Sequence, residues 1–284
     1  MAERVLVTGA NGQLGYDVIK ELTKRNIECV GVDHNDFSIT DKDAVMAYIK
    51  DYKPTAVIHC AAYTAVDAAE DDQELCYAVN ETGSQYIAEA CKAVDAKMMY
   101  ISTDYVFPGT GDAFYEPNDP KGPQNVYGAA KLAGEIKVQD ILDKYFIVRI
   151  SWVFGVNGKN FVKTMLNLAK THDALTVVDD QIGSPTYTAD LARLLVDMIV
   201  TDKYGAYHAT NEGICTWYEF ACEIFKQAGV DIKVRPVTSE AFKTKAKRPL
   251  NSRMSKEALT ANGFKKLPTW QEALADYLPQ VVEK

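Results

Sequence analysis

The sequence of 284 residues lacks several features that would each define a class of protein. It contains no run of the roughly 18 consecutive apolar residues that a membrane-spanning helix needs. Its first five residues lead into a predicted strand without a signal-peptide pattern. Its six cysteines form no C-x-x-C pair and no metal-finger spacing. We therefore expect a cytoplasmic protein with free thiols, no membrane span and no structural metal.

Excess positive charge is also missing. The chain has 31 lysines and arginines against 39 aspartates and glutamates, a formal net charge of -8. It therefore lacks the basic face with which nucleic-acid-binding proteins track phosphates, and we expect no nucleic-acid partner. Basic residues do gather near the C-terminus, as a solvated face or as a local pocket: Lys243, Lys245, Lys247, Arg248 and Arg253.

Short apolar runs rich in β-branched residues alternate with amphipathic stretches. The predicted strands are residues 4–8, 29–33, 56–61, 97–102, 146–151 and 176–178. The predicted helices are residues 12–25, 42–52, 74–94, 126–142 and 159–170. This alternation predicts an α/β fold with a Rossmann-like, doubly wound parallel sheet that is covered by helices on both faces.

The alternation weakens after about residue 150. Residues 217–228 and 269–282 have the pattern of amphipathic helices with Thr216 and Thr269 as N-caps, and Gly229 would end the first of them. Residues 232–236 resemble a short strand. We expect residues 1–150 to form a dinucleotide-binding domain. Residues 151–284 should form mainly a smaller substrate-binding lobe, with some segments returning to the sheet.

A glycine-rich loop follows the first predicted strand and opens the first helix. Gly9, Gly12 and Gly15 have the spacing G-x-x-G-x-x-G. This spacing allows a close approach of the backbone to a pyrophosphate, and the helix N-terminus supplies unpaired N–H groups. The second strand ends in Asp33, which can accept hydrogen bonds from an adenosine ribose and repels a 2′-phosphate. The pattern predicts a site for NADH or NADPH, with NADH preferred.

Catalytic residues are predicted at the end of the fourth strand and in the helix that follows. Thr103 and Asp104 stand at the strand end, and Tyr127 and Lys131 lie four residues apart on one helix face. A tyrosine has a reference pKa of about 10, which a neighbouring ammonium group lowers. A strand-end hydroxyl can hydrogen-bond a substrate oxygen as charge develops on it. We predict Tyr127 as the proton donor, with Lys131 and Thr103 completing the catalytic group.

Together these motifs resemble the dTDP-4-dehydrorhamnose reductases, a family of extended short-chain dehydrogenases. The resemblance covers the whole chain through residues 9–15, 61–67, 80, 102–109, 125–131, 149–154, 180–186 and 248–253. The last two segments separate this family from sugar-nucleotide epimerases and dehydratases. The resemblance implies NAD(P)H-dependent reduction of the C4 keto group of dTDP-4-dehydro-L-rhamnose to dTDP-L-rhamnose, for polysaccharide synthesis.

The resemblance also implies a role for each matching residue. Tyr127 would protonate the C4 oxygen, and Lys131 would hold the cofactor ribose and tune Tyr127. Thr103, Asp104 and Trp152 would contact the sugar. The implied cofactor contacts are Gly9, Asn11, Gly12, Gln13, Leu14, Gly15, Asp33, Ser38, Ile39, Ala61, Ala62, Tyr63, Thr64, Tyr127 and Lys131. At Ser38 the chain departs from the family, which often has Asp there.

Two further ligands have candidate residues. Arg253 suits the diphosphate of the substrate, because a guanidinium group pairs with phosphate oxygens. Some members of the family form homodimers bridged by Mg²⁺, and Asp17 and Asp190 lie in the matching neighbourhoods. An exposed aspartate on a helix is ordinarily just solvated, so we predict no metal in the site itself and leave Mg²⁺ at a dimer interface open.

Two other functions remain open at this point. One is a sugar-nucleotide epimerase or 4,6-dehydratase of the same fold, although a dehydratase needs a second carboxylate where this chain has Tyr105. The other is a regulatory subunit resembling the β-subunit of methionine adenosyltransferase, which keeps the fold without turnover. The combination of Thr103, Tyr127 and Lys131 favours an enzyme over a pure binding module.

Overall fold

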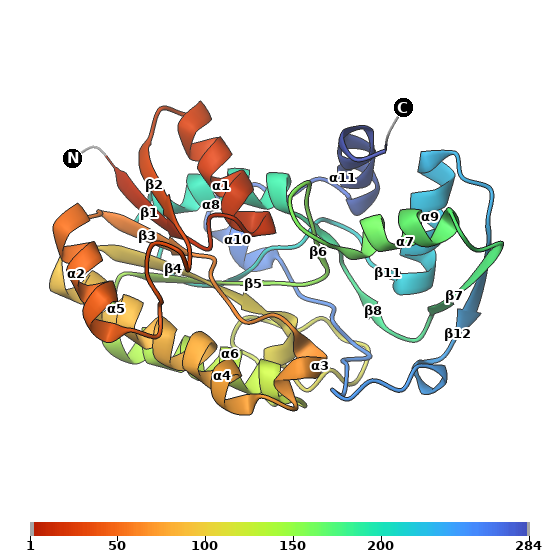
Figure 1. Cartoon of the computed structure of the whole chain (residues 1–284), viewed down its shortest axis with the longest axis horizontal. Coiled ribbons are helices and arrows are strands. Elements are labelled where there is room, and N and C mark those ends of the chain that lie inside the picture. Colours follow the sequence, from red (N-terminus) through yellow and green to blue (C-terminus); the bar gives the residue numbers. More distant parts are fainter. Residues whose placement is uncertain (1–2, 283–284) are drawn as a thin grey trace.

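A six-stranded sheet, parallel throughout, forms the centre of the computed structural model, which describes residues 3–282. Met1 and Ala2 of the expected N-terminal entry, and the last two residues of the expected lobe, lie outside this range. The strand order is β10-β5-β4-β3-β1-β2 (Figure 1). The strands are β1 (Arg4–Thr8), β2 (Glu28–Val32), β3 (Ala56–His59), β4 (Lys97–Thr103), β5 (Tyr145–Ile150) and β10 (Gly205–His208).

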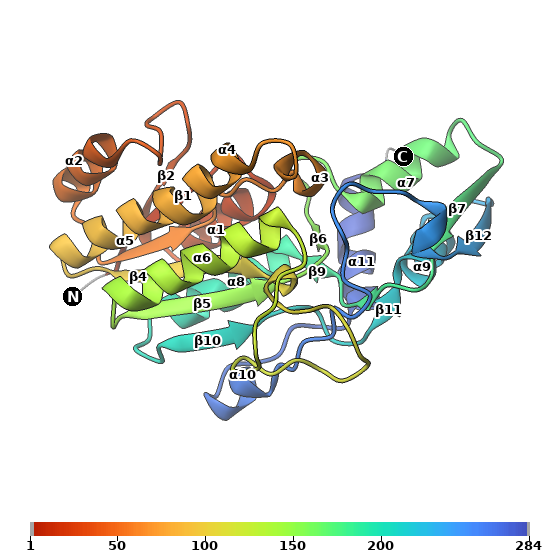
Figure 2. The same cartoon turned by 90° about the horizontal axis from the view of Figure 1, so that it is seen from below.

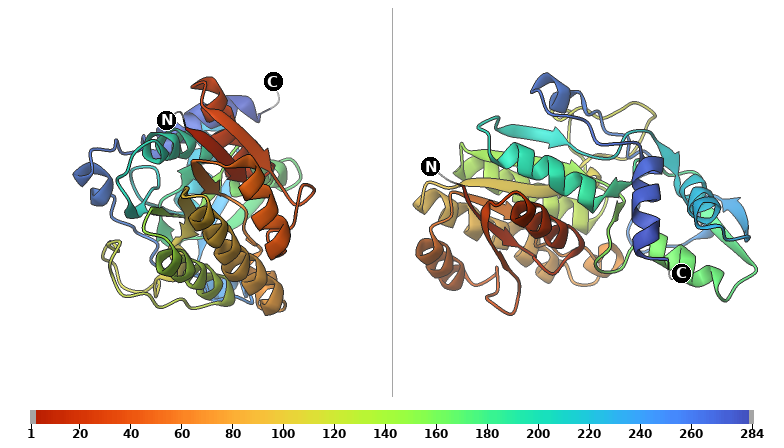
Figure 3. Two further views of the ribbon diagram at one scale, coloured as in Figure 1. Left: turned by 90° about the vertical axis from the view of Figure 1, so that its left-hand side faces the viewer. Right: turned by 90° about the horizontal axis from the view of Figure 1, so that it is seen from above.

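Helices cover both faces of this sheet (Figure 3). On one face lie α1 (Gln13–Lys24) and α8 (Thr188–Ile199), and on the other lie α2 (Lys42–Tyr52), α5 (Ser84–Ala93) and α6 (Val126–Ile141). Val5 and Val7 belong to the hydrophobic core between the sheet and α1 and α8, whereas Leu6 between them belongs to the core on the opposite face. Such alternation is expected of a strand buried on both sides. The predicted Rossmann-like sheet is confirmed.

The helix predicted over residues 74–94 is interrupted. It consists of α4 (Gln73–Tyr77), a π-helical turn, η1 (Ala78–Gly83), and α5 (Figure 2). A π-helical turn inside an α-helix often occurs at a functional site, because the extra residue redirects the neighbouring side chains. Here the turn contains Asn80.

The helix α8, which packs on the sheet, and the strand β10, which belongs to it, were absent from the prediction. Nine of the twelve residues of α8 are buried, and Tyr187 before it provides no side-chain cap. Its exposed polar residues, Arg193 and Asp197, form only a narrow stripe, and the usual start signal is missing. Strand β10 has only four residues, which is too short for a clear alternating pattern.

A smaller lobe lies beyond one end of the sheet (Figure 1). There β7 (Ala174–Val178) pairs in parallel with β12 (Lys233–Val237), and α7 (Phe161–Ala169), α9 (Trp217–Ala228) and α11 (Trp270–Tyr277) contribute to a third core. Thr216 and Thr269 form the expected N-caps, and Gly229 ends α9 in the left-handed conformation. The short elements are α3 (Val66–Ala69), α10 (Glu257–Ala261), β6 (Val153–Phe154), β8 (Ile182–Gly183), β9 (Thr186–Tyr187), β11 (Cys215–Thr216), η2 (Asp104–Val106), η3 (Ser239–Ala241) and η4 (Leu278–Gln280).

Among residues 3–282, none of the helices has the length and apolar character needed to cross a bilayer. The six cysteines are free thiols, as expected.

Candidate active site

The order of the strands places a topological switch point at the carboxyl ends of β1 and β3. From β1 the chain continues to β2 on one side, whereas β3, β4 and β5 follow on the other. Ligands of open α/β sheets bind at such a switch point. The glycine loop, residues 9–15, follows β1, and Ala61 follows β3. A Cβ atom on Gly9 would lie 2.7 Å from the nitrogen of Ala61, so the two predicted cofactor segments are in contact.

The glycine loop is shaped by its own backbone. Gly9 has a φ of +66°, and its carbonyl oxygen accepts a hydrogen bond from the N–H of Gly12 at 2.9 Å. A Cβ atom on Gly15 would lie 2.2 Å from that same oxygen. Gly12 is the N-cap of α1 and offers no side chain to the N–H groups of the first turn, which include those of Gln13 and Leu14. This open cradle of N–H groups fits the pyrophosphate of a dinucleotide.

Asp33 lies beside the glycine loop. Its carboxylate accepts hydrogen bonds from the side chain of Asn11 and, at 2.7 Å, from the N–H of Asn35. Further along, the hydroxyl of Ser38 is 2.7 Å from that of Thr40, and Ile39 lies against Gly83 of the π-helical turn. The predicted ribose and adenine contacts therefore lie along the chain that leaves β2.

Asn80 fixes the loop after β3, a role that the sequence analysis did not assign. Its side-chain oxygen accepts from the N–H of Tyr63 at 3.0 Å, and its side-chain nitrogen donates to the carbonyl of Tyr63 at 3.0 Å. Asn80 thereby holds the chain between Ala62 and Thr64 from both sides. The sequence signal that could have found it is an asparagine inside a helical pattern, and the structure shows this asparagine to be buried.

The predicted catalytic residues come together where β4 ends and α6 begins. The hydroxyl of Thr103 donates to the carboxylate of Asp104 at 3.0 Å and accepts from the N–H of Tyr105, whose ring packs against that of Tyr127. The ammonium group of Lys131 donates to the carbonyl of Ile101 at 2.7 Å and lies 4.0 Å from the centre of the Tyr100 ring. The predicted catalytic residues therefore lie together around the end of β4.

Burial dominates the protonation of this group. It raises the pKa of Tyr127, which the hydrogen bond with Thr103 only partly offsets, and it lowers the pKa of Lys131 to about 7. Burial outweighs any lowering of the Tyr127 pKa by Lys131, and the tuning of Tyr127 by Lys131 stays a prediction. Tyr127 stays protonated at neutral pH, which is the state that a proton donor needs.

Asp104 connects the strand end to the lobe. Its carboxylate accepts from the hydroxyl of Ser252 as well as from Thr103. Burial raises the pKa of Asp104 to about 6, although both hydrogen bonds work in the opposite direction.

A large pocket with a volume of about 1090 Å³ opens beside the catalytic group. Tyr105 lines it, and its ring stands edge-on to that of Tyr127 with centroids 5.5 Å apart. Trp152 also lines the pocket, with a φ of 52°, and stacks on Trp217 with ring centroids 3.8 Å apart. The other lining residues are Phe161, Met165, Thr176, Val177, Val178, Gln181, Ser239, Glu240, Phe242, Lys243, Thr244, Lys245, Ala246, Lys247, Arg248, Pro249, Leu250 and Ser252.

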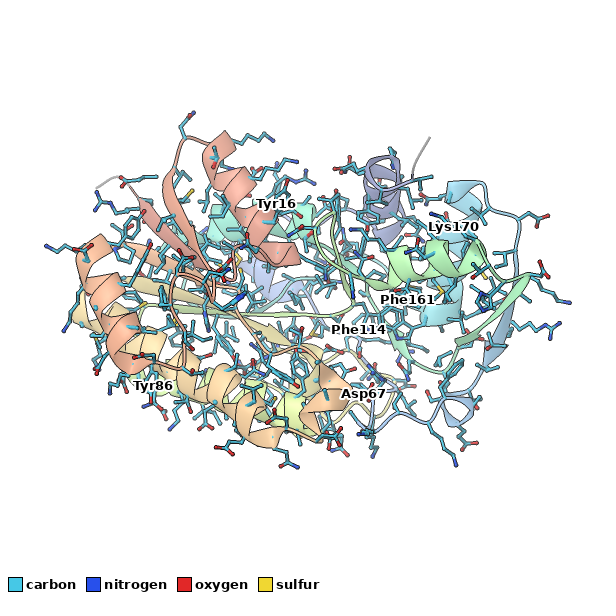
Figure 4. The ribbon with its side chains drawn as sticks, in the orientation of Figure 1. Tyr16, Asp67, Tyr86, Phe114, Phe161 and Lys170 are labelled. Atoms are coloured by element: carbon cyan, nitrogen blue, oxygen red, sulfur yellow. The ribbon has the colours of Figure 1, made fainter. Side chains whose placement is uncertain are left out.

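The structure separates the two arginines of the C-terminal basic group. Arg248 lines the pocket and donates to the carboxylate of Asp67 at 2.7 Å and to the hydroxyl of Tyr105 at 3.2 Å. Figure 4 shows Asp67 on α3 and Phe161 on α7, in the two parts of the molecule that flank this pocket. Arg253 is not among the described lining residues, and its guanidinium donates to Asn251 at 3.0 Å. The sequence analysis chose Arg253 and gave Arg248 no separate role.

Asp17 and Asp190 are not solvated, contrary to expectation. Each is 3% exposed, because α1 packs against α8. Asp17 accepts from Thr188, and Asp190 accepts from Arg193 and Asn211. Their oxygens are thus engaged inside the molecule, which does not fit a metal at a subunit interface. Across residues 3–282, no group of three or more His, Cys, Asp or Glu side chains is placed to hold a metal ion.

A parallel sheet with a glycine loop at its switch point and a Tyr-x-x-x-Lys helix beside β4 defines the extended short-chain dehydrogenase/reductase class. The family model for the RmlD substrate binding domain matches residues 3–283. The dTDP-4-dehydrorhamnose reductase of Streptomyces griseus is 42% identical over 283 residues, which cover 97% of this chain and 93% of that protein. The chain belongs to the dTDP-4-dehydrorhamnose reductase family.

Two solved structures also resemble this chain over nearly its whole length. The reductase of Bacillus anthracis, in complex with NADP, has a TM-score of 0.96 and 44% sequence identity, with 99% of this chain and 100% of that chain covered. The reductase of Clostridium acetobutylicum has a TM-score of 0.95 and 44% identity, with 97% and 98% covered.

Proposed function

We propose that the protein reduces the C4 keto group of dTDP-4-dehydro-L-rhamnose to dTDP-L-rhamnose with NADH or NADPH. The observation that carries the proposal is the position of Tyr127. It lies at the start of α6, where the hydroxyl of Thr103 at the end of β4 affects its pKa, and its ring packs against that of Tyr105, which lines the pocket. A proton donor therefore stands between the cradle for a dinucleotide and a pocket large enough for a nucleotide sugar.

The chain's own residues supply the proton and stabilise the charge that moves. A bound nicotinamide cofactor would supply a hydride to C4 of the sugar. As negative charge develops on the C4 oxygen, Tyr127 donates its proton to that oxygen, and Thr103 hydrogen-bonds the same centre. The ammonium group of Lys131 would stabilise the phenolate that remains on Tyr127 and would hold the cofactor ribose.

Asp33 supports the preference for NADH within this proposal. Its carboxylate stands beside Asn11 of the glycine loop, where it suits ribose hydroxyls and opposes a 2′-phosphate. NADPH would also serve, because the hydrogen bonds that Asp33 accepts from Asn11 and from the N–H of Asn35 weaken its repulsion of the 2′-phosphate.

The substrate contacts follow from the pocket. We assign Thr103, Asp104 and Trp152 to the sugar, and an arginine to the diphosphate. Arg253 is the residue expected from the sequence, whereas Arg248 lies on the pocket wall. Residues 1–150 would then chiefly hold the cofactor, and residues 151–284 would chiefly hold the nucleotide sugar. A cytoplasmic location is proposed as expected from the sequence, and a homodimer as the family resemblance implies.

Turnover of the purified protein tests the proposal. Incubation with dTDP-4-dehydro-L-rhamnose and NADH should consume the absorbance of the reduced cofactor and yield dTDP-L-rhamnose in equal amount. Tyr127→Phe is the control for chemistry that bypasses the site. Isomerisation of the sugar without net oxidation of cofactor would favour an epimerase. Absence of turnover together with capture of a partner synthetase would favour a regulatory subunit.

A further inference from the structure

A short segment of the lobe, residues 155–160, lies against the glycine loop and takes no part in the function described so far. We propose that this segment holds the glycine loop in the conformation that receives the pyrophosphate, with Asn157 as a positioning residue. Cofactor affinity then depends on the lobe as well as on the sheet. The inference rests on the proposed function, since it takes the glycine loop as the seat of a dinucleotide.

Asn157 fixes one peptide group of the loop. Its side-chain nitrogen donates to the carbonyl of Asn11 at 2.7 Å. That carbonyl shares a planar peptide group with the N–H of Gly12, which donates to the carbonyl of Gly9 at 2.9 Å. Asn157 and Gly9 therefore hold opposite ends of the same peptide plane, and the plane cannot turn without losing one of the two hydrogen bonds.

The next peptide group presents its N–H to the ligand. The carbonyl of Gly12 accepts from the N–H of Tyr16 at 3.2 Å, and the amide of Asn157 lies 3.4 Å away. In a trans peptide the N–H points away from the carbonyl. With its carbonyl turned towards α1 and the lobe, this peptide directs the N–H of Gln13 out of the loop, where a phosphate oxygen can accept from it.

The segment is itself anchored at several points. The ammonium group of Lys163 on α7 donates to the carbonyls of Val156 and Gly158 at 2.6 and 2.9 Å. Gly158 has a φ of +74°, and a Cβ atom there would lie 3.2 Å from Cγ of Gln13. Asn160, the N-cap of α7, donates to the side-chain oxygen of Gln13 at 3.1 Å. These contacts connect α7, through the segment, to Gln13 at the start of α1.

Replacement of Asn157 separates hydrogen bonding from packing. Asn157→Leu keeps the size of the side chain and removes the donor without adding charge. Asn157→Asp keeps the shape, and its carboxylate faces two carbonyls and the pyrophosphate. Matched changes at Asn167, which is exposed on helix α7, are the controls. Calorimetric titration with NADH, with ADP-ribose and with adenosine, which lacks the pyrophosphate, shows which part of the cofactor is affected.

We expect Asn157→Leu to weaken binding of NADH and ADP-ribose about 3- to 10-fold, the usual worth of one hydrogen bond, and to leave adenosine unchanged. Asn157→Asp should weaken both further, and the Asn167 variants should match the wild type. Unchanged NADH affinity in both Asn157 variants would overturn the inference and leave the proposed function intact. Equal losses for adenosine would also overturn it, because they indicate a general defect of folding. Failure of the wild type to bind either NADH or NADPH would instead contradict the proposed function itself.

Discussion

The two sides of the site are held together in different ways. On the sheet side, the glycine loop, the loop after β3 and the end of β4 follow neighbouring strands, and backbone pairing places them; Thr103 is in register with Ile150 of β5. On the lobe side, the pocket wall depends on side-chain contacts such as the stack of Trp152 on Trp217 and the pair of Arg248 with Asp67. We infer that the chemistry belongs to the side held by backbone pairing, and substrate recognition to the side held by side-chain contacts.

The largest effect should come from the sheet side. Tyr127→Phe removes the proton donor and keeps the ring that packs against Tyr105. Turnover should fall roughly 10²- to 10⁴-fold, the usual worth of a positioned acid–base group. Steady-state kinetics measures the loss, and titration with NADH should show unchanged cofactor affinity. Turnover close to that of the wild type would remove Tyr127 from the mechanism.

Asp104 joins the two sides, and its protonation should affect the stability of the fold. Burial raises its pKa to about 6, so the folded protein holds this proton more tightly than the unfolded chain does. This contribution to stability is present below the unfolded pKa of about 4 and is lost as pH rises through about 6. Asp104→Asn should remove up to about 3 kcal/mol of that pH dependence.

Denaturant unfolding between about pH 4 and pH 7 measures this change. Asp112→Asn is the matched control, because Asp112 is exposed. Identical slopes of stability against pH for wild type and Asp104→Asn would show that Asp104 has an ordinary pKa in solution.

On the lobe side, the two arginines should differ in their effect on substrate binding. Arg248→Ala should weaken binding of the nucleotide sugar about 10- to 100-fold, because Arg248 lines the pocket and charge-assisted hydrogen bonds contribute roughly 1.5–3 kcal/mol. Arg253→Ala should cause a smaller loss, and Arg253→Lys should recover part of it. Calorimetry with the sugar nucleotide and with NADH separates the two ligands. A larger loss at Arg253 would restore the assignment made from the sequence.

The smallest effect should be a change in cofactor preference. Asp33→Ala removes a negative charge from the place where the 2′-phosphate of NADPH would lie. The ratio of kcat/KM for NADPH to that for NADH should rise by about tenfold, corresponding to roughly 1.4 kcal/mol. Kinetics with both cofactors gives this ratio. If it stays constant, Asp33 does not face the adenosine ribose.

The sheet side could largely be predicted from the sequence, because its signals are local. Glycine spacing, a strand-end aspartate and two residues four apart on a helix each belong to one short segment. The bounds of β1 and α2 agree with the prediction for the same reason. What the local pattern could not give is the protonation of Tyr127, since burial depends on the packing of the whole chain.

The lobe side was harder to predict, because its contacts join distant segments. The partners of Arg248, namely Asp67 and Tyr105, are 181 and 143 residues away in the sequence. The burial of Asp17 follows from the packing of α1 on α8, a helix that has no capping side chain to mark its start and was missed. Pairing over such distances leaves no periodicity that a single sequence could reveal.

The course of the chain through β10 limits how this protein can be divided. The chain leaves the sheet after β5, builds β7 of the lobe, and then returns to place α8 and β10 against β5 and α1 (Figure 2). A fragment that ends at residue 150 would expose the open edge of β5 and the apolar surface that α8 covers. A single cut therefore yields no independent cofactor module. Recombination of substrate lobes between relatives would need junctions on both sides of the returning segment, residues 188–208.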